Sequence, residues 1–358
     1  MSGPFTYPET VPAMHAHLRE RLKDVVPDFE LKLKAEVAVE VNRLKREKNA
    51  IILGHNYMEP ALFHSVPDYT GDSLYLARVS AKAQAQTIVF CGVKFMAETA
   101  KSLNPTRKVL LPSAKGGCSL AESITAAEVR ELKALYPGVP SVTYVNCYQE
   151  VKAEVDYVCT SGNAEEVVKH ILAQGHRKII FLPDEYLAAN VARQTGMAIV
   201  YPERNGKLSK AAEPAGAEKV MIGWRGRCEV HDKFTVGDVT NARKQFPDVL
   251  VLAHPECSPD VVKASDYAGS TTQMIKFVEE MKSGRYLLLT ECTMGDNIAS
   301  RNPQREMIRL CSVRCPHMNE ISLEETLESL RHDRYEITVD EDVRLRSMTS
   351  LERMLAIG

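Results

Sequence analysis

Asp68-Tyr69-Thr70-Gly71-Asp72-Ser73 is a short stretch whose pattern recurs twice further along the chain. The second copy is Asp156-Tyr157-Val158-Cys159-Thr160-Ser161, and the third is Asp266-Tyr267-Ala268-Gly269-Ser270-Thr271. Each copy consists of Asp-Tyr, three further residues and a residue with a hydroxyl group. One match arises easily by chance, but three copies in similar surroundings indicate an internal repeat, which decides the fold.

The segments around the three copies are also alike. An apolar run precedes each copy, at residues 50–53, 141–145 and 249–252. A helical pattern follows, as at residues 74–86 and 273–282, and then a second apolar run at residues 87–90, 178–182 and 286–289. Continuous apolar runs favour strands buried on both faces of a parallel sheet, and alternating strands and helices are typical of βαβ units. The sequence therefore predicts three repeated α/β units.

Each predicted unit ends with a cysteine: Cys118, Cys228 or Cys315. The middle unit is longer than the other two, and we expect its extra residues to form a loop between Tyr201 and Lys219, which is rich in Gly, Pro and Lys. We predict three domains. They are residues 1–138 with an N-terminal helical extension, residues 139–245, and residues 246–358 with a C-terminal tail of an extra strand and a short helix.

Composition narrows the class of protein. The chain has 358 residues, a length that suggests two or three domains. Of these residues 44% are hydrophobic and 26% charged, the balance of a soluble globular protein. Lys and Arg number 45 against 47 Asp and Glu, so nothing in the net charge of −2 indicates a nucleic-acid partner. No apolar run is long enough for a membrane helix, and the N-terminus lacks the pattern of a secretory signal. We expect a cytoplasmic protein without a membrane partner.

The cysteines indicate a metal centre. The chain has nine, and none forms a C-x-x-C pair, which argues against a zinc ribbon or a thioredoxin-type site. Cys118, Cys228 and Cys315 close equivalent units, and iron–sulfur clusters prefer thiolate ligands. Three ligands would leave one iron open as a Lewis acid. Buried thiols without a metal and a three-thiolate zinc site are the alternatives, and Cys311 competes with Cys315 as the third ligand.

Arginines accompany two of these cysteines. Arg225 and Arg227 precede Cys228, and Arg314 precedes Cys315. We expect their charges to lower the pKa of the neighbouring thiols and to offset the charge of a thiolate-bound cluster.

Polar residues gather where strands end and helices begin. His55, Asn146 and His254 follow the first strands of the three units, at the carboxyl edge where open parallel sheets bind ligands. Glu256 is a candidate general base, and Tyr57 and Tyr144 are candidate proton donors, although Tyr144 also suits the core. Hydroxyl groups stand at the three expected helix starts, where they serve either as N-caps or as anion sites: Ser73, Ser161 and Thr271. Together these positions predict a small polyanionic substrate.

At this point the residues resemble a known family. The matching segments include Gly54-His55-Asn56-Tyr57, Gly117-Cys118-Ser119, Cys228-Glu229-Val230-His231, His254-Pro255-Glu256-Cys257 and Cys315-Pro316-His317-Met318. Together with 71–73, 144–146, 159–161 and 269–271 they cover most of residues 50–330, and they resemble the quinolinate synthase family of bacterial NAD biosynthesis. Two departures are Gly162 after Ser161 and the spacing of Cys311 and Cys315, where some relatives have C-x-x-C-x-x-C.

The resemblance implies a fold and a reaction. It implies three αβα three-layer domains with parallel sheets around a pseudo-threefold axis, and a [4Fe–4S] cluster at the centre on Cys118, Cys228 and Cys315. It implies condensation of iminoaspartate with dihydroxyacetone phosphate to quinolinate, with loss of phosphate and water. A transient contact with the aspartate-oxidising enzyme would supply the imine. Two rival interpretations stay open: another [4Fe–4S]-dependent hydro-lyase, and a non-catalytic iron–sulfur carrier or redox sensor.

The resemblance also assigns roles to individual residues. It implies that Tyr57, Glu256 and His231 handle protons. The residues that it places around the substrate or its intermediates are His55, Ser73, Tyr144, Val145, Asn146, Ser161, His254, Pro255, Glu256 and Thr271.

Overall fold

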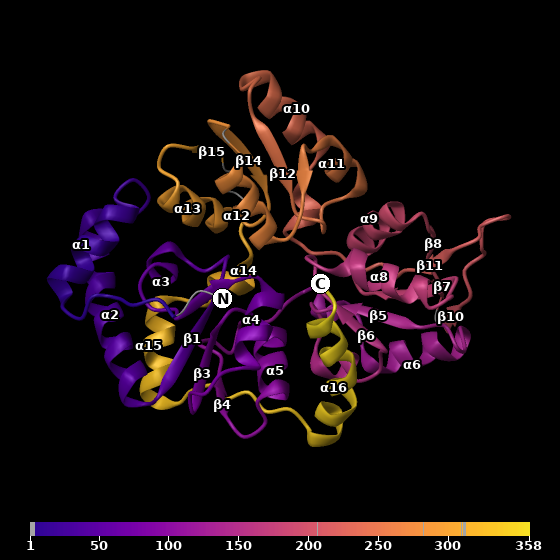
Figure 1. Ribbon diagram of the computed structural model, residues 1–358, viewed down its shortest axis with the longest axis horizontal. Coiled ribbons are helices and arrows are strands. Elements are labelled where there is room, and N and C mark those ends of the chain that lie inside the picture. Colours follow the sequence, from indigo (N-terminus) through magenta and orange to yellow (C-terminus); the bar gives the residue numbers. More distant parts are fainter. Residues whose placement is uncertain (1–3, 206, 282, 309, 311–312) are drawn as a thin grey trace. The chain divides into compact units, whose positions relative to one another are not determined.

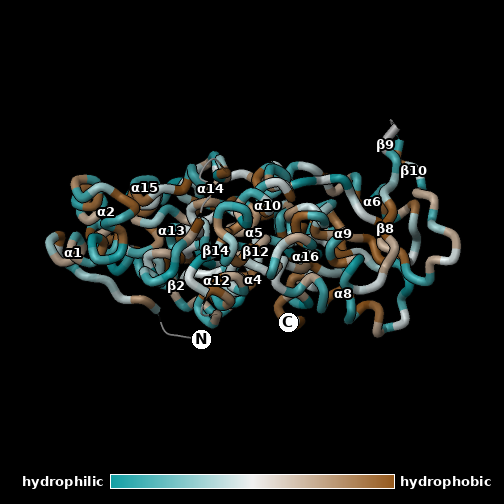
Figure 2. The backbone as a smooth tube through the Cα atoms, turned by 90° about the horizontal axis from the view of Figure 1, so that it is seen from above, coloured by the Kyte–Doolittle hydropathy of each residue, from teal (hydrophilic) through white to brown (hydrophobic). Residues whose placement is uncertain are grey.

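A computed structural model describes residues 4–205, 207–281, 283–308, 310 and 313–358. It confirms the predicted α/β class, with three sheets of parallel strands flanked by helices (Figure 1). No helix within these ranges is long and apolar enough to cross a bilayer. Hydrophilic and hydrophobic segments alternate along the helices (Figure 2), as expected where one side of a helix packs on a sheet.

The first sheet has the strand order β2-β1-β3-β4. Its strands are β1 (Ala50–His55), β2 (Tyr69–Gly71), β3 (Thr87–Cys91) and β4 (Lys108–Leu110). The helices before and between them are α1 (Val11–Leu22), α2 (Asp28–Glu47), α3 (Pro60–Phe63), α4 (Ser73–Ser80) and α5 (Lys94–Leu103). Helix α4 ends earlier than predicted because Arg107 binds the carbonyls of Gln84 and Ala85 at 3.1 and 2.7 Å, outside any helix.

The second sheet has the order β6-β5-β7-β11-β8. Its strands are β5 (Ser141–Tyr144), β6 (Tyr157–Cys159), β7 (Lys178–Leu182), β8 (Ala198–Val200) and β11 (Val220–Ile222). Its helices are α6 (Ala126–Leu135), α7 (Gln149–Lys152), α8 (Ala164–Ala173) and α9 (Glu185–Thr195). The expected loop contains a hairpin, β9 (Glu203–Asn205) and β10 (Lys207–Ser209), because the Leu208 side chain is buried and its N–H donates to Glu131 of α6 at 3.1 Å.

The third sheet has the order β13-β12-β14-β15. Its strands are β12 (Leu250–Ala253), β13 (Tyr267–Ala268), β14 (Arg285–Leu289) and β15 (Glu306–Ile308). The helices of this part are α10 (Val236–Gln245), α11 (Pro259–Ala264), α12 (Thr271–Glu280) and α13 (Cys292–Arg301). Helices α14 (Pro316–Asn319) and α15 (Leu323–His332) follow Cys315. In the tail from residue 333 onward, the expected extra strand is only an isolated antiparallel bridge between Glu336 and Leu110, and the final helix, α16 (Glu341–Ala356), is longer than predicted.

The Asp-Tyr copies form the edge strands β2, β6 and β13. In each copy the Asp carboxylate accepts a hydrogen bond of 2.8 Å from a backbone N–H of the neighbouring first strand. The Asp N–H donates back to the carbonyl of the same residue, at 2.8, 3.1 and 2.8 Å. The three pairs are Asp68 with Ile52, Asp156 with Ser141, and Asp266 with Val251. These reciprocal bonds fix the register of each edge strand, which explains why the pattern is repeated.

Contacts divide the chain into two compact units. Unit 1 holds residues up to Gly117, Asp248–Leu250 and Ile275–Thr338, and unit 2 holds Cys118–Pro247, Val251–Met274 and Val339–Gly358. Each of the three predicted domain ranges contains the strands of one parallel sheet. The boundaries of these ranges stay a prediction. The pseudo-threefold arrangement also stays a prediction.

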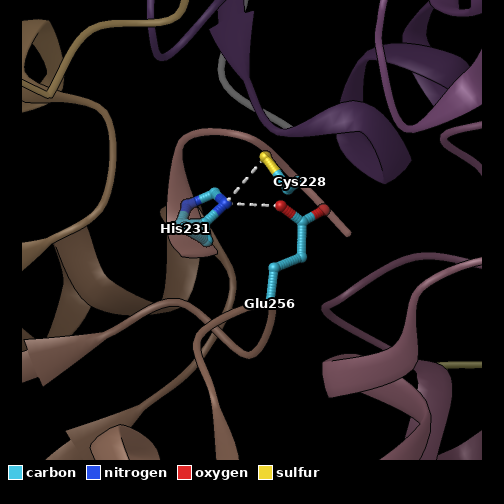
Figure 3. A group of neighbouring side chains, drawn as sticks. All are labelled: Cys228, His231 and Glu256. Atoms are coloured by element: carbon cyan, nitrogen blue, oxygen red, sulfur yellow. Dashed lines mark hydrogen bonds and ion pairs between the residues drawn. The ribbon is translucent and has the colours of Figure 1, made fainter. Parts of the chain in front are cut away.

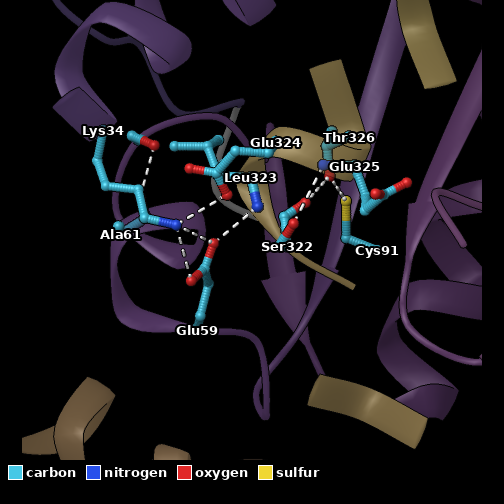
Figure 4. A network of polar contacts seen from close by, with 10 residues as sticks. Lys34, Glu59, Ala61, Cys91, Ser322, Leu323, Glu324, Glu325 and Thr326 are labelled. Atoms are coloured by element: carbon cyan, nitrogen blue, oxygen red, sulfur yellow. Dashed lines mark hydrogen bonds and ion pairs between the residues drawn. The ribbon is translucent and has the colours of Figure 1, made fainter. Parts of the chain in front are cut away.

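The helix that follows each closing cysteine contacts the elements of the next repeat. Helix α6 contacts α7, α10 contacts α11, and α15 contacts α2 and β3. The contact of α15 is reinforced by Glu59, whose Oε1 accepts from the Leu323 N–H at 2.7 Å and from Lys34 Nζ at 3.2 Å (Figure 4). The helix after the third closing cysteine, α15, therefore packs against elements of the first repeat.

Candidate active site

Unit 2 contains a buried cluster of acid–base groups with Glu256 at its centre. Glu256 Oε2 lies 2.5 Å from His231 Nδ1, and His231 Nδ1 lies 3.3 Å from Cys228 Sγ (Figure 3). Glu256 Oε1 accepts a hydrogen bond from Asn146 Nδ2 at 3.1 Å. The His231 and His254 rings stack with centroids 4.5 Å apart. Buried polar groups are costly unless paired, so this network accounts for their burial.

Strand register shows which of these residues occupy equivalent positions. Counting from the strand residue that the Asp binds, His55, Tyr144 and His254 come three positions later in the three repeats. We expected Asn146 to match the two histidines, but this position belongs to Tyr144. Asn146 instead matches Tyr57 and Glu256, because β5 ends at Tyr144 and the chain turns after it.

The charge of Glu256 is set by its neighbours. Burial raises the pKa of this carboxyl group, but the charge and hydrogen bond of His231, the charge of His254 and a hydrogen bond from Tyr144 outweigh burial and lower the pKa to about 2. Glu256 is therefore a carboxylate at neutral pH, fit to accept a proton or to hold an imidazolium.

The expected effect of the arginines on the thiol is wrong at Cys228. Burial raises the pKa of the Cys228 thiol, and the nearby Glu256 carboxylate and Cys118 raise it further. Arg225 and Arg227 instead form ion pairs with Glu185, at 3.3 and 2.9 Å. The Glu185 carboxylate therefore offsets their charges, and they do not lower the pKa of the Cys228 thiol.

The three predicted ligand cysteines occupy equivalent places in their repeats. Each cysteine carbonyl accepts from the N–H four residues later, at 3.1, 3.0 and 3.1 Å. Seven residues after each cysteine a hydroxyl residue caps a helix: Thr125 of α6, Thr235 of α10 and Ser322 of α15. Two residues before each cysteine, a carbonyl accepts from the first N–H of α5, α9 or α13, at 2.7, 2.7 and 3.2 Å. All three cysteines are half-buried.

Cys311 is the other candidate for the third ligand. Cys311 lies outside the described residues, so its competition with Cys315 stays open. Cys118 and Cys228 lie in unit 2 and influence each other electrostatically, whereas Cys315 lies in unit 1.

The distances among Cys228, His231 and Glu256 do not match those of three ligands on a single zinc ion. Their ligand atoms lie within 4.8 Å of one another. Two ligands at about 2.0–2.1 Å from a tetrahedral zinc lie more than about 3 Å apart. The 2.5 Å between His231 Nδ1 and Glu256 Oε2 is shorter than that and is the distance of a direct hydrogen bond.

Unit 1 holds a second group of predicted residues. The His55 and Tyr57 rings meet edge to face with centroids 4.7 Å apart, and the Tyr57 hydroxyl lies 2.5 Å from Thr290 Oγ1. Tyr57 also lines a cavity of about 410 Å³ together with Glu291 and Arg314. This arrangement gives the Tyr57 hydroxyl a proton partner and access to a cavity.

The hydroxyl groups at the helix starts are not N-caps. Asp72 caps α4 and Ser270 binds the N–H of Gln273 at the start of α12, so Ser73 and Thr271 are the first helical residues. Ser161 lies in the turn before α8, whose N-cap position is Asn163. Capping therefore does not explain these three hydroxyl groups, and their role as anion sites stays a prediction.

Comparison with known proteins identifies the family of this chain. A family model described as "Quinolinate synthetase A protein" matches residues 39–356. A "Quinolinate synthase" of Caulobacter vibrioides is 46% identical over 99% of this chain and 90% of its own length. A "Quinolinate synthase 2" of Mesorhizobium japonicum is 45% identical over 97% and 99% of the two chains. This chain belongs to the quinolinate synthetase A family.

Within this quinolinate synthetase A chain, two more predicted residues contribute mainly backbone groups. The Val145 N–H donates to Cys159 at 2.8 Å, and the Pro255 carbonyl accepts from Asn190 at 2.9 Å. The roles of all predicted site residues stay predictions.

Sequence reasoning missed two buried carboxyl groups of the family chain beside the cysteine loops. Asp184 and Glu291 occupy the N-cap positions of α9 and α13. Burial raises the pKa of both, that of Glu291 to about 7, while the backbone N–H groups of Cys228 and Cys315 respectively act in the opposite direction. The sequence signal is an acidic residue two positions after the second strand of the second and third repeats, β7 and β14.

Proposed function

We propose that this chain condenses iminoaspartate with dihydroxyacetone phosphate to form quinolinate, with release of phosphate and water, in de novo NAD biosynthesis. We also propose that Cys118, Cys228 and Cys315 hold a [4Fe–4S] cluster. The observation that carries the proposal is the equivalence of the three cysteine turns, each with the same backbone bond and the same helix cap seven residues later.

The donor set fits such a cluster. The cysteines are half-buried, and each follows a backbone carbonyl that accepts a hydrogen bond from the first N–H of a helix. When bound, a cluster with three protein thiolates supplies one iron with an open position, which acts as a Lewis acid toward a substrate oxygen.

The chain's own residues supply charge and proton transfer. Glu256 is a carboxylate held by His231, Asn146 and Tyr144, so it is placed to accept a proton from a carbon or nitrogen beside an imine. The Tyr57 hydroxyl, with Thr290 as its partner, is a candidate donor for the leaving oxygen. Ser73, Ser161 and Thr271, none of which is used as a cap, are candidate donors to the carboxylate and phosphate groups.

The test is anaerobic purification followed by iron and sulfide counts and an assay with both substrates. Wild type should hold close to four irons and form quinolinate. Cys118→Ser, Cys228→Ser and Cys315→Ser should each lose the cluster, whereas Cys311→Ser should keep it. Cys91→Ser is the matched control, because Cys91 is fully buried and lies 3.5 Å from Thr326 Oγ1, away from the cysteine turns.

The same experiment separates the rival functions. An intact cluster without quinolinate would favour another cluster-dependent hydro-lyase, and transfer of the cluster to an apo acceptor without turnover would favour a carrier. The burial of Glu256, His231 and His254, at most 4% exposed, supports an enzyme. A cytoplasmic location and transient contact with an aspartate-oxidising enzyme belong to the same proposal.

A further inference from the structure

Two turns that carry the predicted proton-handling residues have the same construction. In His254-Pro255-Glu256-Cys257 the Cys257 N–H donates to the His254 carbonyl at 2.9 Å, and the Glu256 N–H donates to His254 Nδ1 at 3.3 Å. In His55-Asn56-Tyr57-Met58 the Met58 N–H donates to the His55 carbonyl at 3.0 Å, and the Tyr57 N–H donates to His55 Nδ1 at 3.2 Å.

A buried asparagine brackets the turn of unit 2. Asn190 lies on α9 and is 2% exposed. Its Nδ2 donates to the carbonyls of Pro255 at 2.9 Å and Cys257 at 3.0 Å. These carbonyls stand on either side of Glu256, so one amide group holds the backbone before and after that residue.

A second buried asparagine does the same in unit 1. Asn297 lies on α13 and is 3% exposed. Its Nδ2 donates to the carbonyls of Asn56 at 3.1 Å and Met58 at 2.8 Å, on either side of Tyr57. Among the described residues its Oδ1 has no hydrogen-bond partner. A buried, unpaired oxygen is unfavourable, so stability of the helix alone does not explain this residue.

The two asparagines occupy the same position in their repeats. Each lies six residues after the acidic N-cap of its helix, Asp184 for α9 and Glu291 for α13. The corresponding residue of α5 is Thr99, whose hydroxyl donates to Phe95 in its own helix at 2.9 Å. The same amide bracket therefore occurs twice, and both times around a residue with a predicted proton-transfer role.

We propose that Asn190 and Asn297 are positioning residues that hold Glu256 and Tyr57, respectively, in the orientation needed for proton transfer. The catalytic part rests on the proposed function, and the bracketing itself does not. Misplacement of a reacting group by about 1 Å can cost about 100-fold in rate, which is the scale on which loss of such a bracket acts.

Hydrogen exchange of the cluster-free protein tests the bracketing alone. Asn→Asp keeps the size of the side chain but turns an oxygen toward two carbonyl oxygens. Asn297→Asp should speed exchange in peptides containing residues 55–59 but not in those containing 254–258, and Asn190→Asp should do the reverse. Asn302→Asp is the control, since Asn302 is the C-cap of the same helix, is 6% exposed, and its Nδ2 donates to the Ile298 carbonyl of that helix at 3.1 Å.

Double-mutant cycles test the catalytic part. Asn297→Asp should lower kcat by about 10- to 100-fold, with a smaller change in KM and unchanged iron content. In a Tyr57→Phe background the same change should cost less than about threefold, because the residue acts through Tyr57. Asn190→Asp and Glu256→Gln should form the corresponding pair.

An equal loss of kcat with and without the second substitution, Tyr57→Phe or Glu256→Gln, would overturn the proposal. So would faster hydrogen exchange across the whole unit in all three of Asn297→Asp, Asn190→Asp and Asn302→Asp. If wild type with an intact cluster forms no quinolinate, the proposed function fails. The exchange experiment then still decides whether the two asparagines hold their turns.

Discussion

His64 shows at the residue scale how burial changes one side chain. It is 4% exposed, and its Nε2 lies 2.7 Å from Ser300 Oγ. Burial, together with the charges of Arg301, Arg21 and His17, lowers its pKa to about 3. The folded protein therefore keeps this imidazole neutral over a range in which the unfolded chain protonates it.

The sign of the resulting pH dependence follows from this difference. The contribution of neutral His64 is complete above the unfolded pKa of 6.5 and is lost as the pH falls toward 3. His64→Gln should therefore lose less stability than wild type between pH 7.5 and 4.5, by about 2–3 kcal/mol, in urea unfolding of the cluster-free protein. The exposed His170→Gln is the control, and an equal acid sensitivity of wild type and His64→Gln would contradict the prediction.

The three repeated aspartates offer a comparison at matched positions. Asp68 also pairs with the buried Lys45 at 2.9 Å, whereas Asp266 pairs with the more exposed Arg243 at 3.0 Å. Asp68→Asn should lower the free energy of unfolding by about 3 kcal/mol, because it leaves a buried ammonium without its partner. Asp266→Asn should cost about 1 kcal/mol. An equal loss of unfolding free energy in the two variants, by thermal or urea unfolding, would show that Lys45 adds nothing to the backbone hydrogen bonds of Asp68.

At the scale of elements, the start of α15 is held by a side chain from another segment. Ser322 caps the helix, and Glu59 accepts the Leu323 N–H while pairing with Lys34 of α2 (Figure 4). The N-cap of this helix lies seven residues after Cys315, so this contact links the N-terminal helices to a predicted ligand loop of unit 1.

Glu59→Gln should destabilise the cluster-free protein by about 1–2 kcal/mol, because it weakens charge-assisted bonds to an N–H and an ammonium. Glu324→Gln is the matched control, since its carboxylate is about half exposed and pairs with the same Lys34 ammonium at 2.9 Å. Glu324→Gln should lower the free energy of unfolding by no more than about 0.5 kcal/mol. Hydrogen exchange of residues 316–332 should rise in the first variant only.

At the scale of the whole molecule, the tail is an integral part of unit 2. Leu351 and Met354 of α16 are fully buried, and Ser350 donates to the Lys152 carbonyl at 2.9 Å. The Ile357 carbonyl accepts from Asn163 at 2.7 Å, next to the turn that carries Ser161. The last helix therefore supports the edge strand β6 and the start of α8.

Removal of residues 339–358 should destabilise unit 2 by about 3 kcal/mol or more, from the loss of two buried apolar side chains alone. Peptides of residues 141–173 should exchange faster in the truncated protein, whereas peptides of β1 and β3 in unit 1 should keep their protection. Uniform loss of protection in both units would show that the chain unfolds as one cooperative body.

The sequence by itself determined the α/β class, the three repeats, most strand and helix positions and the family. These features depend on local patterns: apolar runs, turn residues and motif spacing act over a few neighbouring residues. Tertiary structure alone decided that Asn146 matches Tyr57 rather than His55, that the hydroxyl groups are not caps, and that Asn190 reaches a turn 65 residues away. Such partners depend on sheet register and helix packing, which bring together backbone groups that no local pattern connects.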